Sequence, residues 1–247
     1  MRISATRCRV KQAFLNLRLT KPDRVAAFDR GLRLNGYKVI PGTTMTPGPQ
    51  DILVTWNRIG IGASAARAFE SAGRPVLVAE NASWGNDFAD SRWYHIARNR
   101  HNTAGRFDDH GPERWDALGV ELAPWRTEGE TVILAQRGIG AAPTAMPRSW
   151  PQEAQARYGG RIRHHPGTRS TTALMDDLAH CGRVVTWGSG AAIKALLWGI
   201  PVVSEMPDWI GEQNNTDEGR LAMLRRLAWA QWTMDEISEG VPFRCLL

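Results

Sequence analysis

The fold is decided by the stretch Arg183-Val-Val-Thr-Trp-Gly-Ser-Gly-Ala-Ala-Ile-Lys-Ala-Leu-Leu-Trp-Gly-Ile-Pro-Val-Val203. A short apolar strand runs directly into Gly188-Ser189-Gly190, and these residues open a helix. The helix stops at Gly199, and Pro201 begins the next strand. A strand, a helix and a second strand in this order are typical of a parallel sheet. The stretch therefore predicts an α/β fold.

The loop between the strand and the helix has the composition of an anion site. We expect the backbone N–H groups at the start of the helix to be unpaired and to point outward, where the helix dipole also favours negative charge. Gly188 and Gly190 would let a phosphate approach the backbone closely, and the Ser189 hydroxyl would add a donor. The alternative is an ordinary tight connection between a strand and a helix.

The same alternation of elements extends in both directions from this stretch. Upstream, we expect a strand, a helix, a strand and a helix at residues 131–135, 150–158, 161–165 and 171–180. Near the N-terminus, the pattern predicts helix 21–34, strands 37–40 and 51–56, helix 63–72 and strand 75–79. Two Rossmann-like lobes follow from this order, with a boundary near residues 126–130.

Two segments stand apart from this alternation. Residues 82–126 are polar, rich in tryptophan and irregular, as is common in loops that cover a site. Residues 220–239 predict one long helix with an apolar face, which would cross back to brace the first lobe. The expected domains are an acceptor-side lobe at 1–128, a donor lobe at 129–216 and the returning helix at 217–247.

Composition narrows the class of protein. The chain has 247 residues, 43% of them hydrophobic and 23% charged, which excludes a fibrous or disordered class. Its net charge of +6 favours anionic partners such as nucleotides or DNA, although the alternative is simply a basic soluble protein. No run of about 18 apolar residues predicts a membrane span, and the basic N-terminus does not resemble a secretory signal.

Several site chemistries are excluded by missing motifs. The three cysteines, Cys8, Cys181 and Cys245, form neither a disulfide framework nor a metal cluster, so a reducing cytoplasm is the expected setting. The histidines lack the spacing of a metal-binding helix, and there is no phosphate-binding Gly-Lys-Ser/Thr motif. Trp187-Gly-Ser-Gly190 lacks the residue between glycine and serine that a hydrolase elbow requires. We expect no metal and no bound cofactor.

The decisive stretch resembles the donor-binding half of GT-B glycosyltransferases, especially the capsule-polysaccharide and Kdo-transferase-like groups. Those proteins carry a serine, then Glu-Ala-Leu, then Gly-x-Pro-Val after a strand. The residues that match are Ser189, Ala195-Leu196, Gly199 and Pro201-Val202. Lys194 stands where the pattern has its glutamate, so the ribose contact that the pattern implies has no counterpart here.

Two further elements carry the same resemblance, which covers residues 130–205 and hardly touches the N-terminal lobe. Arg163-His164-His165-Pro166 is similar to an Arg-x-His-Pro strand end, and the resemblance implies that Arg and His approach the donor diphosphate. Gln136-Arg137-Gly138 lies where a loop of this family commonly touches the donor. The resemblance thus implies Arg137, Gly138 and His165 as donor-binding residues beside the Gly188–Gly190 loop, although a capped strand end is the simpler interpretation of His-His-Pro.

The first lobe would supply the acceptor side. Glu80, at the end of a predicted strand, is placed to act as a catalytic base, with Asp87 as the next candidate. Asn57 and Arg58 follow another strand and could bind a phosphate. Trp84 and Trp93 could stack on a sugar or a base. The alternatives are a helix cap or an ion pair for Glu80, and core packing for either tryptophan.

Together these patterns predict a nucleotide-sugar-dependent glycosyltransferase, with a UDP-linked sugar as co-substrate. A looser resemblance, resting on Trp187-Gly-Ser-Gly190, Trp229-Ala-Gln-Trp232 and overall size, links the chain to small phage glycosyltransferases. Some of those are associated with hydroxymethylated pyrimidines in DNA, so the acceptor would be such a base. Two alternatives stay open: a capsule-like glycan acceptor, and a non-catalytic module that binds phosphate or nucleic acid. The sequence does not indicate an oligomeric state.

Overall fold

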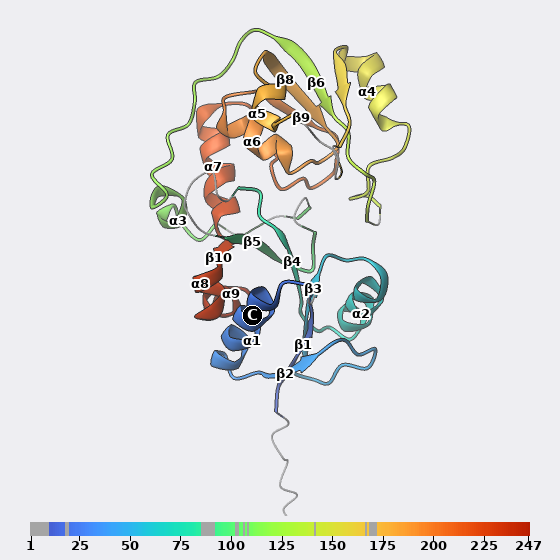
Figure 1. Cartoon of the computed structure of the whole chain (residues 1–247), viewed down its shortest axis with the longest axis vertical. Coiled ribbons are helices and arrows are strands. Elements are labelled where there is room, and N and C mark those ends of the chain that lie inside the picture. Colours follow the sequence, from blue (N-terminus) through green and yellow to red (C-terminus); the bar gives the residue numbers. More distant parts are fainter. Residues whose placement is uncertain are drawn as a thin grey trace, which may run out of the picture. The chain divides into compact units, whose positions relative to one another are not determined.

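The computed structural model describes residues 10–17, 20–84, 92–101, 104–105, 107, 109–140, 142–165, 167 and 172–247. These residues form two compact units (Figure 1). Unit 1 comprises the described residues of Met1–Glu80, Ile96–Asn99 and Trp232–Leu247, and unit 2 those of Asn81–His95 and Arg100–Gln231. Residues 100–128 therefore group with unit 2, whereas the sequence placed the lobe boundary after them. The division into functional lobes stays a prediction.

Unit 1 is built on a six-stranded sheet whose outer strands β5 and β10 begin within unit 2. The strand order is β10 (Gln231–Thr233), β5 (Trp93–Arg98), β4 (Val76–Asn81), β3 (Ile52–Trp56), β1 (Gln12–Asn16) and β2 (Lys38–Pro41). The pairs β1–β2, β1–β3 and β3–β4 are parallel. Their carboxyl ends consequently meet at one edge, where open α/β sheets bind ligands.

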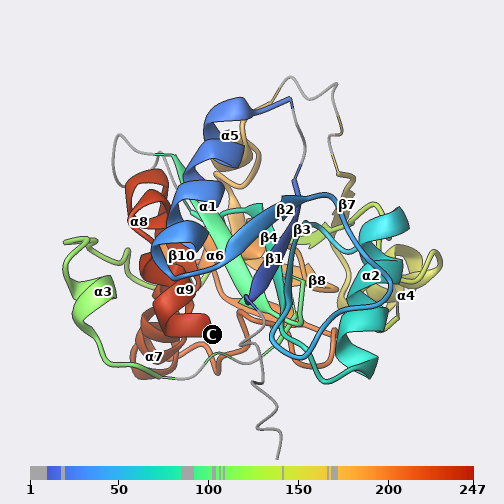
Figure 2. The ribbon, with the colours of Figure 1, turned by 90° about the horizontal axis from the view of Figure 1, so that it is seen from below.

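Helices cover both faces of this sheet, because alternate strand residues point to opposite sides. Its helices are α1 (Pro22–Leu34), α2 (Gly60–Ser71), α8 (Met234–Ser238) and α9 (Val241–Leu246). Phe69 of α2 packs on Leu53 and Val76, and α1 lies on the opposite side of strands β1 to β4 (Figure 2).

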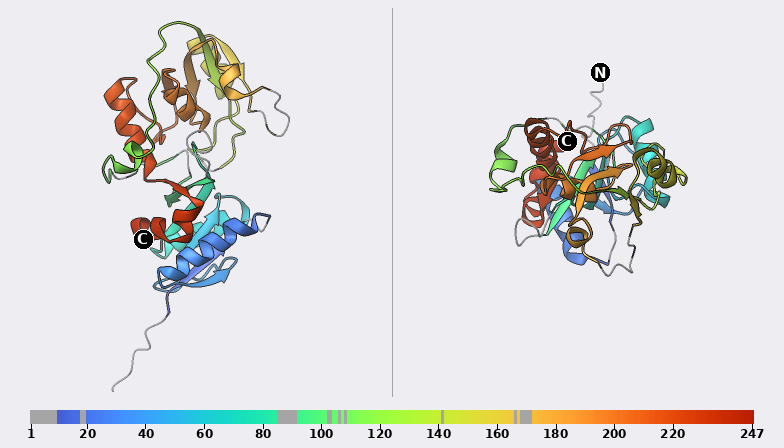
Figure 3. Two further views of the ribbon diagram at one scale, coloured as in Figure 1. Left: turned by 60° about the vertical axis from the view of Figure 1, so that its left-hand side comes forward. Right: turned by 90° about the horizontal axis from the view of Figure 1, so that it is seen from above.

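The C-terminal helices α8 and α9 lie beside α1 (Figure 3). The ring centroids of Phe28 and Phe243 are 5.8 Å apart. A Cβ atom at Gly31 would approach the Ile237 carbonyl oxygen to 2.0 Å, so glycine permits the close crossing of α1 and α8. The end of the chain is thereby a structural part of unit 1.

Unit 2 contains a four-stranded sheet that is parallel throughout. The strand order is β7 (Arg161–Arg163), β6 (Glu130–Leu134), β8 (Cys181–Thr186) and β9 (Val202–Ser204). Its helices are α3 (Glu113–Asp116), α4 (Trp150–Tyr158), α5 (Leu174–Asp177), α6 (Ala191–Leu197) and α7 (Asp217–Ala228). Ile133 and Val185 pack on α4, while Val132 and Val184 pack on α6 and α7, so this sheet is also covered on both faces.

β9 is an edge strand of this sheet, and a side chain forms hydrogen bonds with its outer backbone groups. Asn215 accepts the N–H of Val202 at 2.9 Å and donates to the Val202 carbonyl oxygen at 3.1 Å. Its amide thus forms the two hydrogen bonds that a neighbouring strand would supply. Among the described helices, none has the length and apolar character that crossing a membrane requires.

The expected α/β class with parallel sheets is confirmed, and the decisive stretch forms β8, α6 and β9. The single helix expected at residues 220–239 is wrong. Helix α7 ends at Ala228, β10 follows, and Thr233 starts the new helix α8. The Thr233 hydroxyl accepts the Glu236 N–H at 3.2 Å, and the Glu236 carboxylate accepts the Thr233 N–H at 2.9 Å. This capping box fixes a second helix start inside the segment.

Candidate functional site

The motifs singled out in unit 2 lie at one edge of its sheet. Leu134 is in register with both Arg163 and Thr186, and Thr186 is in register with Ser204. Because all four strands are parallel, the loops that follow them leave from the same, carboxyl edge. Gln136–Gly138, His165 and Gly188–Gly190 each belong to one of these loops. The structure therefore gathers the donor-binding candidates at the edge where this class of sheet binds ligands.

The loop after β8 differs from the expectation in how its backbone N–H groups are used. The Gly188 N–H donates to Gln136 Oε1 at 3.1 Å, and the Ser189 N–H donates to Thr186 Oγ1 at 2.9 Å. The Ala191 N–H donates to Ser189 Oγ at 3.2 Å. These three amides were expected to be unpaired, and that expectation is wrong. Side chains at the end of β8, in the loop itself and in the loop after β6 already accept their hydrogen bonds.

The two glycines of this loop have different reasons to be glycine. A Cβ at Gly188 would lie 2.8 Å from Met206 Sδ, so packing restricts this position. At Gly190 an added Cβ meets no described atom within 4 Å, and its φ of −59° suits any residue. Neither packing nor backbone conformation in the described structure requires glycine at position 190. The open side of Gly190 leaves room for a group that approaches the backbone.

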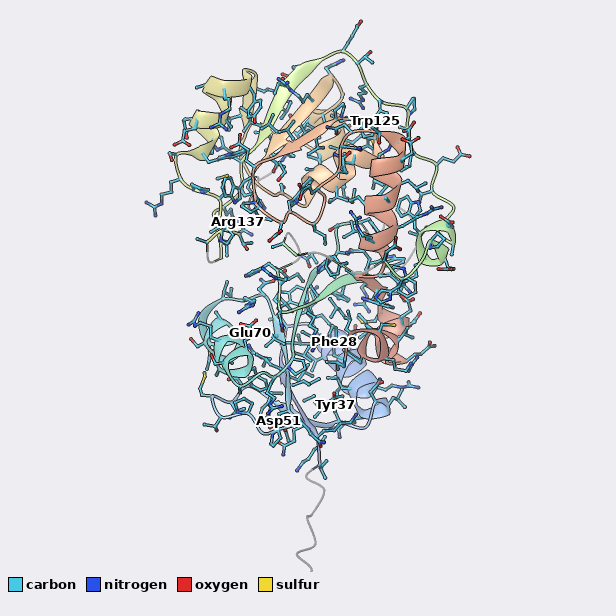
Figure 4. The ribbon with its side chains drawn as sticks, turned by 180° about the vertical axis from the view of Figure 1, so that it is seen from behind. Phe28, Tyr37, Asp51, Glu70, Trp125 and Arg137 are labelled. Carbon is cyan, nitrogen blue, oxygen red and sulfur yellow. The ribbon has the colours of Figure 1, made fainter. Side chains whose placement is uncertain are left out.

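The loop after β6 is tied to the loop after β8. Besides accepting from Gly188, Gln136 donates its own N–H to Met146 Sδ at 3.2 Å. Trp187 Nε1 donates to the Pro143 carbonyl oxygen at 2.9 Å. Arg137 is exposed on this loop (Figure 4), next to Gly138, whose φ of +64° favours glycine. The two loops thus hold each other, and Arg137 presents a positive charge at the edge.

The end of β7 supplies an exposed histidine. The Gly167 N–H donates to His165 Nδ1 at 2.9 Å, so the neutral ring, as assigned from this bond, carries its proton on Nε2. Partial burial lowers the pKa of His165, and the positive charges of Arg137 and Arg163 lower it further. Arg163 is ion-paired with Asp177. His165 is therefore a neutral N–H donor near pH 7, close enough to Arg137 to feel its charge.

Glu205, in the loop after β9, supports the same edge of the sheet, and an ion pair neutralises its charge. The Glu205 carboxylate accepts from Trp150 Nε1 at 2.8 Å and forms an ion pair with Arg157. Burial favours its neutral form, but these hydrogen bonds, together with one from Tyr158, lower the pKa of Glu205. Trp150 in turn meets Trp187 edge-to-face, with ring centroids 6.0 Å apart. Glu205 thus anchors Trp150 beneath the loop after β8.

In unit 1, two of the candidates lie on neighbouring strands. The Asn57 N–H donates to the Ala79 carbonyl oxygen at 3.1 Å, which brings the end of β3 beside the strand residue Glu80. Asn57 has a φ of +59°, a conformation that asparagine tolerates better than most residues. Helix α2 begins nearby with no side-chain cap and no acidic residue in its first turn.

Arg58 is bound within unit 1. Its guanidinium donates to both carboxylate oxygens of Glu70 at 2.8 and 2.7 Å, and to the Asn99 carbonyl oxygen at 2.7 Å. Glu70 lies on α2 (Figure 4). A phosphate would have to replace these bonds, so the contacts make Arg58 a support for α2 rather than an open cation.

The two tryptophan candidates, Trp84 and Trp93, are part of unit 2 and pack into its core. Trp84 is only 2% exposed and meets Trp115 with ring centroids 5.5 Å apart. A ring so covered cannot stack on a sugar, so the expected acceptor role of Trp84 is wrong. Trp93 is half-buried against the same core. Asp87 lies outside the described residues.

No family model and no curated protein sequence matches this chain. Among solved structures, the chain is similar to "Thermosulfurimonas dismutans KpsC, beta Kdo 2,4 transferase", with a TM-score of 0.55 and 15% sequence identity. The alignment covers 93% of this chain and 98% of that one. The chain has the fold of this transferase. The expected GT-B-like architecture is therefore supported over nearly the whole length, including the N-terminal lobe for which the sequence carried almost no resemblance.

Two residues that the sequence analysis did not single out also support this edge of the sheet. Gln136 was considered only as part of a loop, although its side chain organises the β8 loop. Glu205 lies two residues after the strand predicted to end at Val203, and that position was the available signal. Among the described residues there is no cluster of three or more His, Cys, Asp or Glu side chains that would hold a metal ion.

Proposed function

We propose that this protein is a glycosyltransferase that binds a nucleotide-sugar donor at the carboxyl edge of the four-stranded sheet. The observation that carries the proposal is Gly190, a glycine that the surrounding described structure does not require, beside the Ser189 hydroxyl. Donors and positive charge from Arg137 and His165 lie at the same edge. The similarity to a Kdo transferase supports glycosyl transfer on this fold.

The proposed roles follow from the chemistry of the transfer. The bond between the anomeric carbon and the donor phosphate breaks, a bond to the acceptor oxygen forms, and negative charge collects on the departing nucleotide. Ser189, His165 and Arg137 would stabilise that charge with hydrogen bonds and an opposite charge. Gly190 would let the phosphate come close, and Gly138 would shape the loop that carries Arg137.

On the acceptor side we propose Glu80 as the base that takes the proton of the acceptor hydroxyl, with Asp87 as the alternative. Asn57, which follows the strand beside that of Glu80, would hydrogen-bond the acceptor. Trp93, half-buried, keeps part of its ring for contact. We further propose that the lobes act as donor and acceptor sides and that residues 217–247 join them functionally, so truncation before Arg220 would abolish activity.

The acceptor we propose is a hydroxymethylated pyrimidine in DNA, on the support of the net charge of +6. Incubating the protein with a nucleotide-sugar panel and either hydroxymethylated DNA or a capsule-type oligosaccharide, followed by mass spectrometry, tests this. Transfer to DNA should be lost steeply as salt rises, because phosphate contacts release counterions. Transfer to the oligosaccharide alone would replace DNA by a glycan acceptor.

Donor binding is tested by thermal shift with UDP, GDP and CMP. We expect at least one of them, UDP first, to stabilise the wild type, and Gly190→Asp to abolish that shift while the protein stays folded. Gln152→Glu adds a negative charge on α4 at an exposed site and should leave the shift unchanged. Unchanged nucleotide affinity in folded Gly190→Asp would refute the site. A wild type indifferent to all three nucleotides would instead favour the non-catalytic module.

A further inference from the structure

Three side chains at the carboxyl edge of the four-stranded sheet share one hydrogen-bonding pattern. Gln136 Oε1 accepts from the Gly188 N–H, Ser189 Oγ from the Ala191 N–H, and His165 Nδ1 from the Gly167 N–H. In each case the acceptor atom of the side chain is used by the backbone. Each side chain keeps its donors, which are an amide N–H, a hydroxyl and an imidazole N–H, while a backbone N–H occupies its acceptor atom in part or in full.

Gln136 is the central member of this set. Its loop follows β6, which lies between β7 and β8 in the sheet, so it stands between the loops of His165 and Ser189. The bond from Gly188 fixes which end of the amide is oxygen, since a backbone N–H cannot donate to the NH₂ group. Within the described part of the chain, Gln136 Nε2 has no acceptor and is not a buried atom.

A site whose side chains keep their donors while their acceptor atoms already hold a backbone N–H favours an anion. A neutral ligand such as a free sugar hydroxyl needs acceptors as well as donors, whereas phosphate oxygens at neutral pH are acceptors. Accepting a hydrogen bond from a backbone amide also polarises a side chain, which strengthens the bonds it donates. The nearby charge of Arg137 acts in the same direction.

We infer that Gln136 is a specificity-determining residue of the donor site, which binds the nucleotide phosphate through its Nε2 hydrogens while Oε1 holds Gly188. This inference rests on the proposed function. It assigns to a side chain the role that the loop amides of Gly188, Ser189 and Ala191 cannot fill, because those amides are already bonded within the protein.

Gln136→Glu separates the two functions of this side chain. A carboxylate can still accept from Gly188, but it has no hydrogen to donate and would face the phosphate with an acceptor. Isothermal titration with whichever of UDP, GDP and CMP binds the wild type should show affinity falling about ten- to a hundredfold, the range for a hydrogen bond to a charged group. The melting temperature should stay close to that of the wild type.

Two controls sharpen the outcome. Gln152→Glu, which places the same charge on the exposed face of α4, should keep wild-type affinity. The titration is repeated in about 0.5 M salt, where screening shortens charge repulsion to roughly 4 Å. A direct contact keeps its defect there, and a defect that vanishes in high salt would overturn the inference.

Gln136→Met removes the acceptor and the donors together. If Gln136→Glu binds nucleotide like the wild type while Gln136→Met does not, the residue merely holds Gly188 and the inference is wrong. Equal affinity in all three proteins also overturns it, while donor binding itself stands. A wild type that binds none of the nucleotides overturns the proposed function and this inference with it.

Discussion

Unit 2 contains two clusters in which a glutamine and a histidine occur together. In one the two side chains are buried and bonded to each other, and in the other both reach solvent. In the buried cluster, Gln231 Oε1 accepts the Ser83 N–H at 2.9 Å, and Gln231 Nε2 bonds His95 Nδ1 at 2.7 Å. At the carboxyl edge of the sheet, Gln136 Oε1 accepts the Gly188 N–H, but its Nε2 meets no acceptor in the described structure. The Gln231 amide is hydrogen-bonded within the protein through both its oxygen and its nitrogen. In Gln136 only the oxygen is bonded, so the amide N–H groups are available to a ligand.

The difference teaches what distinguishes a structural polar cluster from a binding one. His95 and Gln231 are fully buried, so every donor and acceptor left unpaired there costs stability, as His95 Nε2 already does among the described residues. Gln136 and His165 reach solvent, where an unpaired donor costs little and can bind a ligand. Substitutions and pH should therefore affect stability in the first cluster and ligand binding in the second.

The largest expected effect comes from acid. Burial lowers the pKa of His95 to about 3, whereas an unfolded histidine titrates near 6.5. Its neutral form therefore stabilises the fold fully above pH 6.5, and this contribution is lost as pH falls toward 3. The loss amounts to at most about 5 kcal/mol in the free energy of unfolding. Up to about 3 kcal/mol of this loss falls between pH 7 and pH 4, where urea titrations measure it.

His95→Gln is the matching variant, because its amide oxygen can accept from Gln231 and does not titrate. Its stability should fall less between pH 7 and pH 4 than that of the wild type. His165→Gln, at the exposed edge, should keep most of the acid dependence of the wild type, because the pKa of His165 is lowered much less than that of His95. Identical pH profiles for wild type and His95→Gln would mean that His95 does not control acid stability.

A smaller effect on the free energy of unfolding is expected when each of the two glutamines is replaced by methionine. Gln231→Met leaves the buried Ser83 N–H and His95 Nδ1 without partners, and each such group costs about 1–3 kcal/mol. Gln136→Met leaves one loop N–H at a half-buried position, so its cost should stay within about 1 kcal/mol. Urea unfolding at pH 7 compares the two. Equal losses of stability in Gln231→Met and Gln136→Met would mean that the buried and the exposed glutamine do not differ in their structural role.

The smallest effect concerns the titration of His165. Its pKa is held below the usual value by partial burial and by Arg137 and Arg163. A bound phosphate adds negative charge, so nucleotide binding should raise this pKa. Nuclear magnetic resonance of the imidazole protons with and without UDP follows the shift. A His165 signal that does not respond while UDP binds would exclude it from the site.

The sequence predicted those parts of the fold whose signals are local. Strand β8, its glycine loop and helix α6 follow one another within 20 residues, and Gly188, Gly190 and Gly199 mark the limits of the loop and the helix. Strand β5 was missed because its buried His95 interrupts the apolar pattern, and β1 because its five residues lie in a basic segment. The capping box at Thr233 was visible in the sequence and marks the helix start that was overlooked.

The candidate site was predictable in position but not in its bonding. Gly188–Gly190 and His165 lie at strand ends, which periodicity can locate. The partner of the Gly188 amide is 52 residues away, and the Arg58 guanidinium meets Glu70 only because α2 folds back along β3. Such pairings depend on packing between elements, so the sequence could not show that Arg58 was engaged or that Gln136 held the loop.

The route of the chain has a consequence for its biosynthesis. The polypeptide leaves unit 1 after Glu80, returns briefly at Ile96–Asn99, and comes back for good only at Trp232. A ribosome therefore completes all of unit 2 before it makes the residues that form α8 and α9. Until then the face of α1 that carries Phe28 has no Phe243 to cover it. All residues of unit 2 are therefore made while α1 still waits for α8 and α9 to cover it.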